Sequence, residues 1–130
     1  MFLLDTDTLI YFFRGQGKVA EQLFATARAD VAVAAISLYE LETGIAKSTQ
    51  PIKRRKQLGE LLDAVKVLPF DRSAAHHAAE LRVALEKKGQ PIGPMDTLIA
   101  GTAVAHRATL VTHNTSEFRR IPNLALADWY

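Results

Sequence analysis

Cysteine is absent from the 130-residue sequence, which excludes disulfides, zinc fingers, iron–sulfur clusters and thiol nucleophiles. Long apolar runs are absent as well, since no stretch approaches the roughly 18 residues of a membrane-spanning helix. The apolar N-terminal residues lead into Asp5 and Asp7 with no basic residue before them, which is not the pattern of a signal peptide. We therefore expect a cytoplasmic protein with no membrane association.

Strong charge of one sign is also missing, because the formal net charge is only +2. This mild basicity allows an anionic partner without requiring one. Hydrophobic residues make up 48% of the chain and charged residues 23%, which disfavours disordered and coiled-coil classes. At this length we expect one domain, residues 1–130, with an ordinary buried core.

Strand and helix patterns alternate along the chain. Short apolar or β-branched segments predict strands at residues 2–4, 31–36, 67–68, 109–112 and 124–126. Helical spacing predicts helices over residues 7–13, 19–29, 37–47, 51–65, 73–88 and 94–107, with a short helical turn at 115–119. This alternation is typical of a three-layer α/β/α domain with a central, mostly parallel sheet.

Acidic residues recur where strands give way to helices. Asp5 follows the first strand, Glu40 lies in the first turn after the second, and Glu117 follows the strand that ends at Thr112. Asp96 lies in the first turn of the helix that Pro94 opens. Because parallel sheets carry their sites beyond the carboxyl ends of the strands, we expect these four carboxylates to converge.

Each acid also has a purely structural interpretation. Ser37 and Glu40 have the spacing of a capping box, in which Glu40 would fold back onto the backbone of Ser37. Asp5 could be a simple helix cap, and Asp96 could favour the helix dipole. These readings hold singly, but they do not account for four acids gathering at one sheet edge.

A cluster of carboxylates requires a cation or raised pKa values. Two carboxylates about 4 Å apart repel by about 4 kcal/mol at an effective dielectric constant of 20. Oxygen ligands without cysteine or paired histidines favour Mg²⁺ or Mn²⁺ over zinc. Such an ion can activate a water molecule and stabilise the leaving oxygen of a phosphodiester.

Four segments together resemble the PIN-domain ribonucleases, specifically the VapC-type toxins of bacterial toxin–antitoxin pairs. The segments occur in the family's order and spacing, and they cover the chain from end to end. They are Phe2-Leu3-Leu4-Asp5-Thr6-Asp7, Ile36-Ser37-Leu38-Tyr39-Glu40-Leu41-Glu42-Thr43-Gly44, Ile92-Gly93-Pro94-Met95-Asp96-Thr97-Leu98-Ile99-Ala100 and Leu110-Val111-Thr112-His113-Asn114-Thr115-Ser116-Glu117-Phe118, and the match closes with Ile121-Pro122-Asn123-Leu124 and Asp128-Trp129.

The resemblance implies a role for each pocket residue. Asp5 and Asp96 would be the principal metal ligands, and Glu40 would complete the acidic pocket. Many relatives carry Asp where this chain has Asn114, so Glu117 would take over the fourth acidic position. The supporting residues would be Asp7, which replaces the commoner Asn, and Thr112, whose hydroxyl would orient a ligand or water.

The resemblance also implies a substrate and partners. The family consists of Mg²⁺-dependent endoribonucleases that cleave RNA, often tRNA. A cognate VapB-type antitoxin would cover the pocket, and the toxin would form a homodimer and a toxin–antitoxin hetero-oligomer. Operator DNA would be bound only through the antitoxin.

Two surface features bear on RNA and antitoxin binding. Arg119 and Arg120 directly follow the acidic pocket and are candidates for phosphate contact, whereas the basic run 53–56 is better explained as a solvated helix face. The three consecutive aromatics 11–13 cannot all face one core. We expect part of that helix to be covered by the antitoxin.

Two other functions remain open at this stage. Asp5 and Asp7 form the Asp-x-Asp pattern of phosphatases with an aspartate nucleophile, but the later lysine and paired acids of that class are missing. The second alternative is a PIN-like module that has lost catalysis and only binds RNA or a partner. The uncharged Asn114 favours it, while the intact Asp5, Glu40 and Asp96 argue against it.

Overall fold

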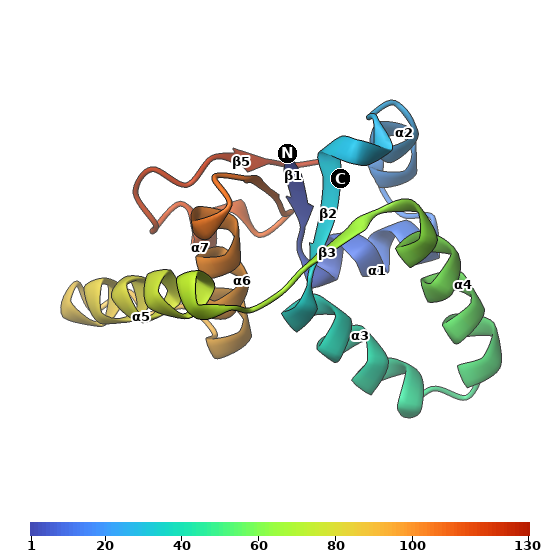
Figure 1. Ribbon diagram of the computed structural model, residues 1–130, viewed down its shortest axis with the longest axis horizontal. Coiled ribbons are helices and arrows are strands. Elements are labelled where there is room, and N and C mark those ends of the chain that lie inside the picture. Colours follow the sequence, from blue (N-terminus) through green and yellow to red (C-terminus); the bar gives the residue numbers. More distant parts are fainter.

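The computed structural model describes residues 1–130, and a five-stranded, fully parallel sheet forms its centre (Figure 1). The strand order is β3-β2-β1-β4-β5, so the N-terminal strand lies in the middle. Helices cover both faces of the sheet, which confirms the predicted α/β/α class. The strands are β1 (Phe2–Leu4), β2 (Val31–Ala34), β3 (Lys66–Leu68), β4 (Thr109–Val111) and β5 (Leu126–Ala127).

The helices follow the strands in the predicted alternation. They are α1 (Thr6–Arg14), α2 (Val19–Phe24), the 3₁₀ turn η1 (Arg28–Asp30), α3 (Ala35–Ala46), α4 (Pro51–Ala64), α5 (Arg72–Lys87), α6 (Pro94–Ala105) and α7 (Thr115–Phe118). Pro51 and Pro94 occupy first-turn positions of α4 and α6, where a missing N–H costs no hydrogen bond. No helix has both the length and the apolarity needed to cross a membrane.

The three central strands, β1, β2 and β4, divide their side chains between two cores. Leu3 and Leu110 pack with α5, α6 and α7, while Leu4 and Val111 pack with helices α1 to α4. Figure 1 shows these two helix groups on opposite sides of the sheet. Strands buried on both faces read as continuous apolar runs, which is why such short segments could be predicted as strands.

Strand register brings the ends of the central strands together. Leu4 of β1 pairs with Val33 of β2 and with Val111 of β4. The residue after Leu4 is Asp5, whose N–H donates to the carbonyl of Val111 at 3.0 Å. The residues that follow β1, β2 and β4 therefore share one edge of the sheet.

Three predicted boundaries were wrong. The helix predicted over 19–29 ends at Phe24, because the following residues to 30 are mostly exposed and gain no burial that would hold them helical. The strand predicted over 31–36 ends at Ala34, where α3 starts directly with no side-chain cap to mark it. The last strand is Leu126–Ala127 rather than 124–126, because Val111 pairs with Ala127.

Candidate active site

Asp5 is a buried carboxylate at the end of the central strand. Its side chain is only 4% exposed, and it caps α1 by accepting a 2.8 Å hydrogen bond from the N–H of Thr8. Burial raises the pKa of Asp5, and hydrogen bonds from Thr112 and Thr8 partly offset that rise. The predicted capping role is confirmed, yet a surface cap would not require this burial.

Glu40 is held toward Asp5 by a residue from another helix. The hydroxyl of Thr6 donates a 2.6 Å hydrogen bond to Oε1 of Glu40. The capping-box interpretation of Ser37 and Glu40 was wrong, because α3 begins at Ala35 and Ser37 lies inside the helix. Glu40 thus sits on the helix face that meets α1, and its carboxylate lies beside the residue that follows Asp5.

Asp96 faces the other acids without a hydrogen-bond partner of its own. It lies in the first turn of α6, half-buried. Its pKa is raised to about 6, first by burial and then by the negative charges of Glu117, Asp5, Glu40 and Asp7 in that order. The structure therefore places Asp5, Glu40 and Glu117 near enough for their negative charges to act on Asp96.

Asn114 and Glu117 form a single hydrogen-bonded unit after β4. The amide nitrogen Nδ2 of Asn114 donates to Oε2 of Glu117 at 2.5 Å. The other oxygen of Glu117 accepts the backbone N–H of Gly93 at 3.1 Å, which ties α7 to the start of α6. Asn114 itself is oriented by its N–H, which donates to the hydroxyl of Thr112.

The supporting residues differ in their surroundings. Thr112 is fully buried next to Asp5, whereas Asp7 is exposed at the edge of the pocket. Arg119 and Arg120 are exposed, but the guanidinium of Arg120 donates to the carbonyl of Pro91 at 2.9 Å. Arg119 makes no such contact, so it is the freer of the two for a phosphate group.

The donor set fits a hard divalent cation. All the converging groups are carboxylate, amide or hydroxyl oxygens, and burial with mutual repulsion disfavours their charged forms. No three carboxylate or imidazole groups stand close enough to form a complete cage. Mg²⁺ does not require one, since it keeps several waters and is bound through one or two carboxylates.

Sequence reasoning missed the groups that orient these acids. Thr6 holds Glu40, the hydroxyl of Thr8 donates to the carbonyl of Val111, and the N–H of Gly93 holds Glu117. The two threonines flank Asp7 in the first turn of α1, so their spacing was visible in the sequence. The Gly93 contact was not, because a backbone donor leaves no residue-type signal.

The chain is similar to known nucleases. The PIN domain family matches residues 2–124. The chain is 34% identical to the tRNA(fMet)-specific endonuclease VapC of Salmonella typhimurium, covering 98% of this chain and 97% of the relative. It is 36% identical to ribonuclease VapC2 of Rickettsia felis, covering 99% and 98%.

Solved structures with the same fold are toxin–antitoxin complexes. VapBC2 from Rickettsia felis bound to a DNA fragment from its promoter matches with a TM-score of 0.93 at 35% identity, covering 99% of this chain and 98% of that one. DNA-bound VapBC from Salmonella typhimurium matches with a TM-score of 0.93 at 33% identity, covering 99% and 98%. These matches overturn the aspartate-nucleophile phosphatase alternative.

Proposed function

The chain belongs to the PIN-domain family and, within it, to the VapC ribonucleases of toxin–antitoxin pairs, and from this premise we propose that it is a Mg²⁺-dependent endoribonuclease that cleaves tRNA in the cytoplasm. The observation that supports the metal dependence most directly is Asp96. Its carboxyl is half-buried, faces Glu117, Asp5 and Glu40, and has a pKa raised to about 6. A divalent cation would relieve that repulsion.

In this proposal Asp5 and Asp96 hold the metal, with Mn²⁺ as a possible substitute for Mg²⁺. The bound ion would supply Lewis-acid activation of water and of the phosphodiester. Thr8 and Thr112 fix the orientation of Asp5, and Thr6 fixes that of Glu40. Glu40 and Glu117 adjust the charge of the pocket and accept protons from water, while Asn114 keeps Glu117 in place.

The proposed products are an RNA fragment with a 3′-hydroxyl and one with a 5′-phosphate, as in-line attack by water would leave them. tRNA is the proposed substrate class because the Salmonella relative is named for it. Arg119 is the proposed phosphate contact beside the pocket, with Arg120 behind it on the same turn.

The proposed partner is a VapB-type antitoxin, as in the neighbouring complexes. A groove of about 510 Å³ lies between α1, α2 and α4 and includes Phe12, Phe13 and Phe24. Phe24 is 80% exposed, and its ring lies 6.2 Å from that of Phe12. Exposed aromatic rings in a groove mark a protein-binding surface, so we propose that an apolar antitoxin segment lies here. Homodimers, toxin–antitoxin hetero-oligomers and operator binding through the antitoxin complete the proposal.

The direct test is cleavage of purified total tRNA by the isolated chain with Mg²⁺, with EDTA, and with an Asp5→Ala variant. Discrete fragments that require both the metal and Asp5 would support the proposal. A folded chain that binds Mn²⁺ but leaves tRNA and total RNA intact would instead support the inactive binding module that Asn114 suggests.

A further inference from the structure

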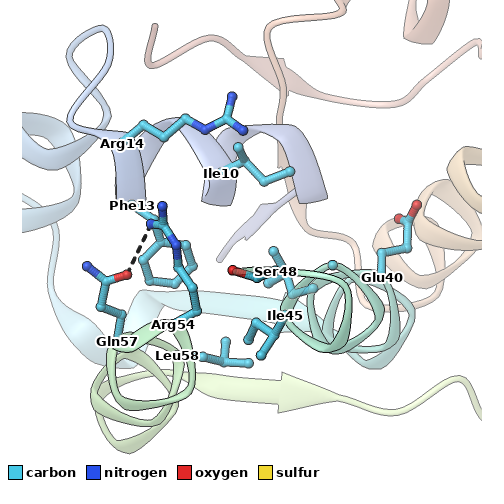
Figure 2. Close-up of a pocket in the computed structure, with 11 residues that line it drawn as sticks. Ile10, Phe13, Arg14, Glu40, Ile45, Ser48, Arg54, Gln57 and Leu58 are labelled. Atoms are coloured by element: carbon cyan, nitrogen blue, oxygen red, sulfur yellow. Dashed lines mark hydrogen bonds between the residues drawn. The ribbon is translucent and has the colours of Figure 1, made fainter. Parts of the chain in front are cut away.

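A second pocket adjoins the acidic site on the side of α3. It has a volume of about 260 Å³ and lies between α1, α3 and α4 (Figure 2). Glu40 stands at one end of it, and Arg54 with Gln57 at the other. Glu40 also accepts the hydroxyl of Thr6, next to Asp5, so this one residue belongs both to the pocket and to the candidate active site.

Two arginines line this pocket without a carboxylate partner. Arg54 of α4 makes only a long hydrogen bond of 3.4 Å to Oε1 of Gln57. Arg14 at the end of α1 makes no ion pair or side-chain hydrogen bond. By contrast, Arg55 pairs with Glu42 at 3.0 Å on the outer surface. Neither guanidinium group is therefore paired with a carboxylate, and both keep N–H donors free for a ligand.

The four side chains of the basic run 53–56 differ in exposure because they point in different directions from the α4 helix. Lys53, Arg55 and Lys56 are exposed, as a solvated helix face predicts, but Arg54 is half-buried and turns into the pocket. Sequence alone treats these four residues alike. Only the packing of α4 against α1 and α3 separates the one that faces the site.

The floor of the pocket is formed mainly by residues of α3 that recur about once per helical turn. Glu40 and Gly44 lie four residues apart on α3, and Ser48 follows just beyond the end of the helix, so the lining extends about 12 Å along the chain from Glu40. A Cβ atom added to Gly44 would meet nothing within 4 Å. The open floor leaves room for a group that enters from the active site.

We infer that this pocket binds a phosphate group of the RNA strand next to the scissile phosphate. Guanidinium groups bind phosphate through paired, charge-assisted hydrogen bonds, and Arg14 and Arg54 provide two that are otherwise unpaired. The groove proposed for a protein partner adjoins this pocket, shares Phe13 and Gln57 with it, and extends along α1 and α2 to Phe24. This inference rests on the proposed function, because it assumes that RNA reaches Glu40.

The test compares two double variants that each remove two positive charges. Arg14→Gln/Arg54→Gln changes the pocket, and Lys53→Gln/Lys56→Gln changes the exposed face of the same α4 helix. Both are made in an Asp5→Asn background, and binding of a fluorescein-labelled single-stranded oligouridylate is measured against salt concentration. Loss of the one phosphate site should lower the salt slope by about 0.7 and weaken binding by about tenfold or more.

The results of these binding measurements support or contradict the phosphate site. A larger loss in the arginine pair than in the lysine pair supports the phosphate site, and equal losses overturn it. A charge-neutral Gly44→Leu variant, which fills the floor of the pocket, should also weaken RNA binding, and unchanged binding would contradict the inference. If the arginine pair weakens binding of a hexaglutamate peptide but not of RNA, the pocket serves an acidic protein segment instead.

The measurement separates this inference from the proposed function. Binding is read in a background that cannot cleave, while cleavage of tRNA is read with the unmodified chain. A pocket-specific change in salt slope without any metal-dependent cleavage would reject the nuclease proposal and retain the phosphate site. Normal tRNA cleavage by the unmodified chain, with equal salt slopes for the two double variants, would support the nuclease proposal and reject the phosphate site.

Discussion

The hydroxyl of Thr6 donates a 2.6 Å hydrogen bond to the carboxylate of Glu40, across 34 residues of sequence. Thr6 directly follows Asp5 at the end of β1, and Glu40 lies on the second turn of α3 after β2. One contact therefore couples two neighbouring strand ends of the parallel sheet. It orients an acid that would otherwise rotate freely on the helix surface.

Replacing Thr6 with Val removes that contact and keeps the side-chain shape. We expect the rate of RNA cleavage to fall about tenfold or more because Glu40 loses its orientation. The free energy of unfolding should change by about 1 kcal/mol or less, since the bond is only partly buried. Single-turnover cleavage and urea unfolding measure the two effects.

Thr43→Val is the matched control for this prediction. Its hydroxyl makes a similar bond, to the carbonyl of Tyr39, but on an exposed turn of α3. Activity should stay close to that of the unmodified chain. Equal losses in the two variants would show that Thr6 acts only through the stability of the helices.

Without metal, the chain should become more stable as pH falls from 7 to 5. The native pKa of Asp96 is about 6, above its value of about 3.9 in an unfolded chain. The native state thus binds more protons between these values, and stability is lost as pH rises through 6. After allowing for solvent screening of this half-exposed group, the effect is about 1–2 kcal/mol.

Thermal unfolding in EDTA across this pH range measures the effect. Asp96→Asn should raise the midpoint at pH 7 and weaken its dependence on pH. Asp5 contributes in the same direction because burial raises its pKa too, so some dependence remains. A midpoint that rises with pH in the unmodified, metal-free chain would be incompatible with the repulsion described for this pocket.

Asn114→Asp should make the pocket more dependent on metal. The amide of Asn114 now donates to Glu117, and an aspartate there would repel that carboxylate instead. We expect a lower unfolding midpoint in EDTA and a larger rise on adding Mg²⁺ than in the unmodified chain. Asn114→Ala, which loses the bond but adds no charge, separates repulsion from loss of the contact. Equal midpoints for the two variants in EDTA would argue against a shared acidic pocket.

The packing of α5 against α6 depends on the absence of a side chain at Gly101. A Cβ atom there would approach the Cβ of Ala78 to 2.6 Å and its backbone to 2.8 Å. Gly101→Ala should therefore cost about 1–3 kcal/mol of stability through overpacking. Gly59→Ala in α4, where nothing lies within 4 Å, should be stabilising by up to about 1 kcal/mol. Urea unfolding of both variants compares them directly.

The acids could be predicted from sequence because local rules position each of them. The buried strand that ends at Asp5 and the helix that Pro94 opens can both be recognised from their residue types. The parallel topology of the sheet then predicts that the two acids lie at the same edge. The start of α3 carries no such signal, since Ala34 provides no side-chain cap. The capping-box error at Ser37 came from that missing marker.

The remaining features of the site depend on packing between distant segments. Gly93 contributes a backbone N–H, which any residue type except proline would carry. Arg54 differs from Lys53 and Arg55 only through the neighbours that α4 meets. Neither property can be predicted from the local sequence, because both depend on how distant segments pack in the folded chain.

The most direct test of the central claim is the rate of tRNA cleavage as a function of Mg²⁺ concentration for the unmodified chain, Asp96→Asn and Asp7→Asn. We expect saturable, Mg²⁺-dependent cleavage that leaves 3′-hydroxyl and 5′-phosphate ends. Asp96→Asn should show no cleavage at any Mg²⁺ concentration, and the exposed Asp7→Asn should stay active. Cleavage by Asp96→Asn at the unmodified rate would contradict the assignment of this acidic pocket as the catalytic metal site.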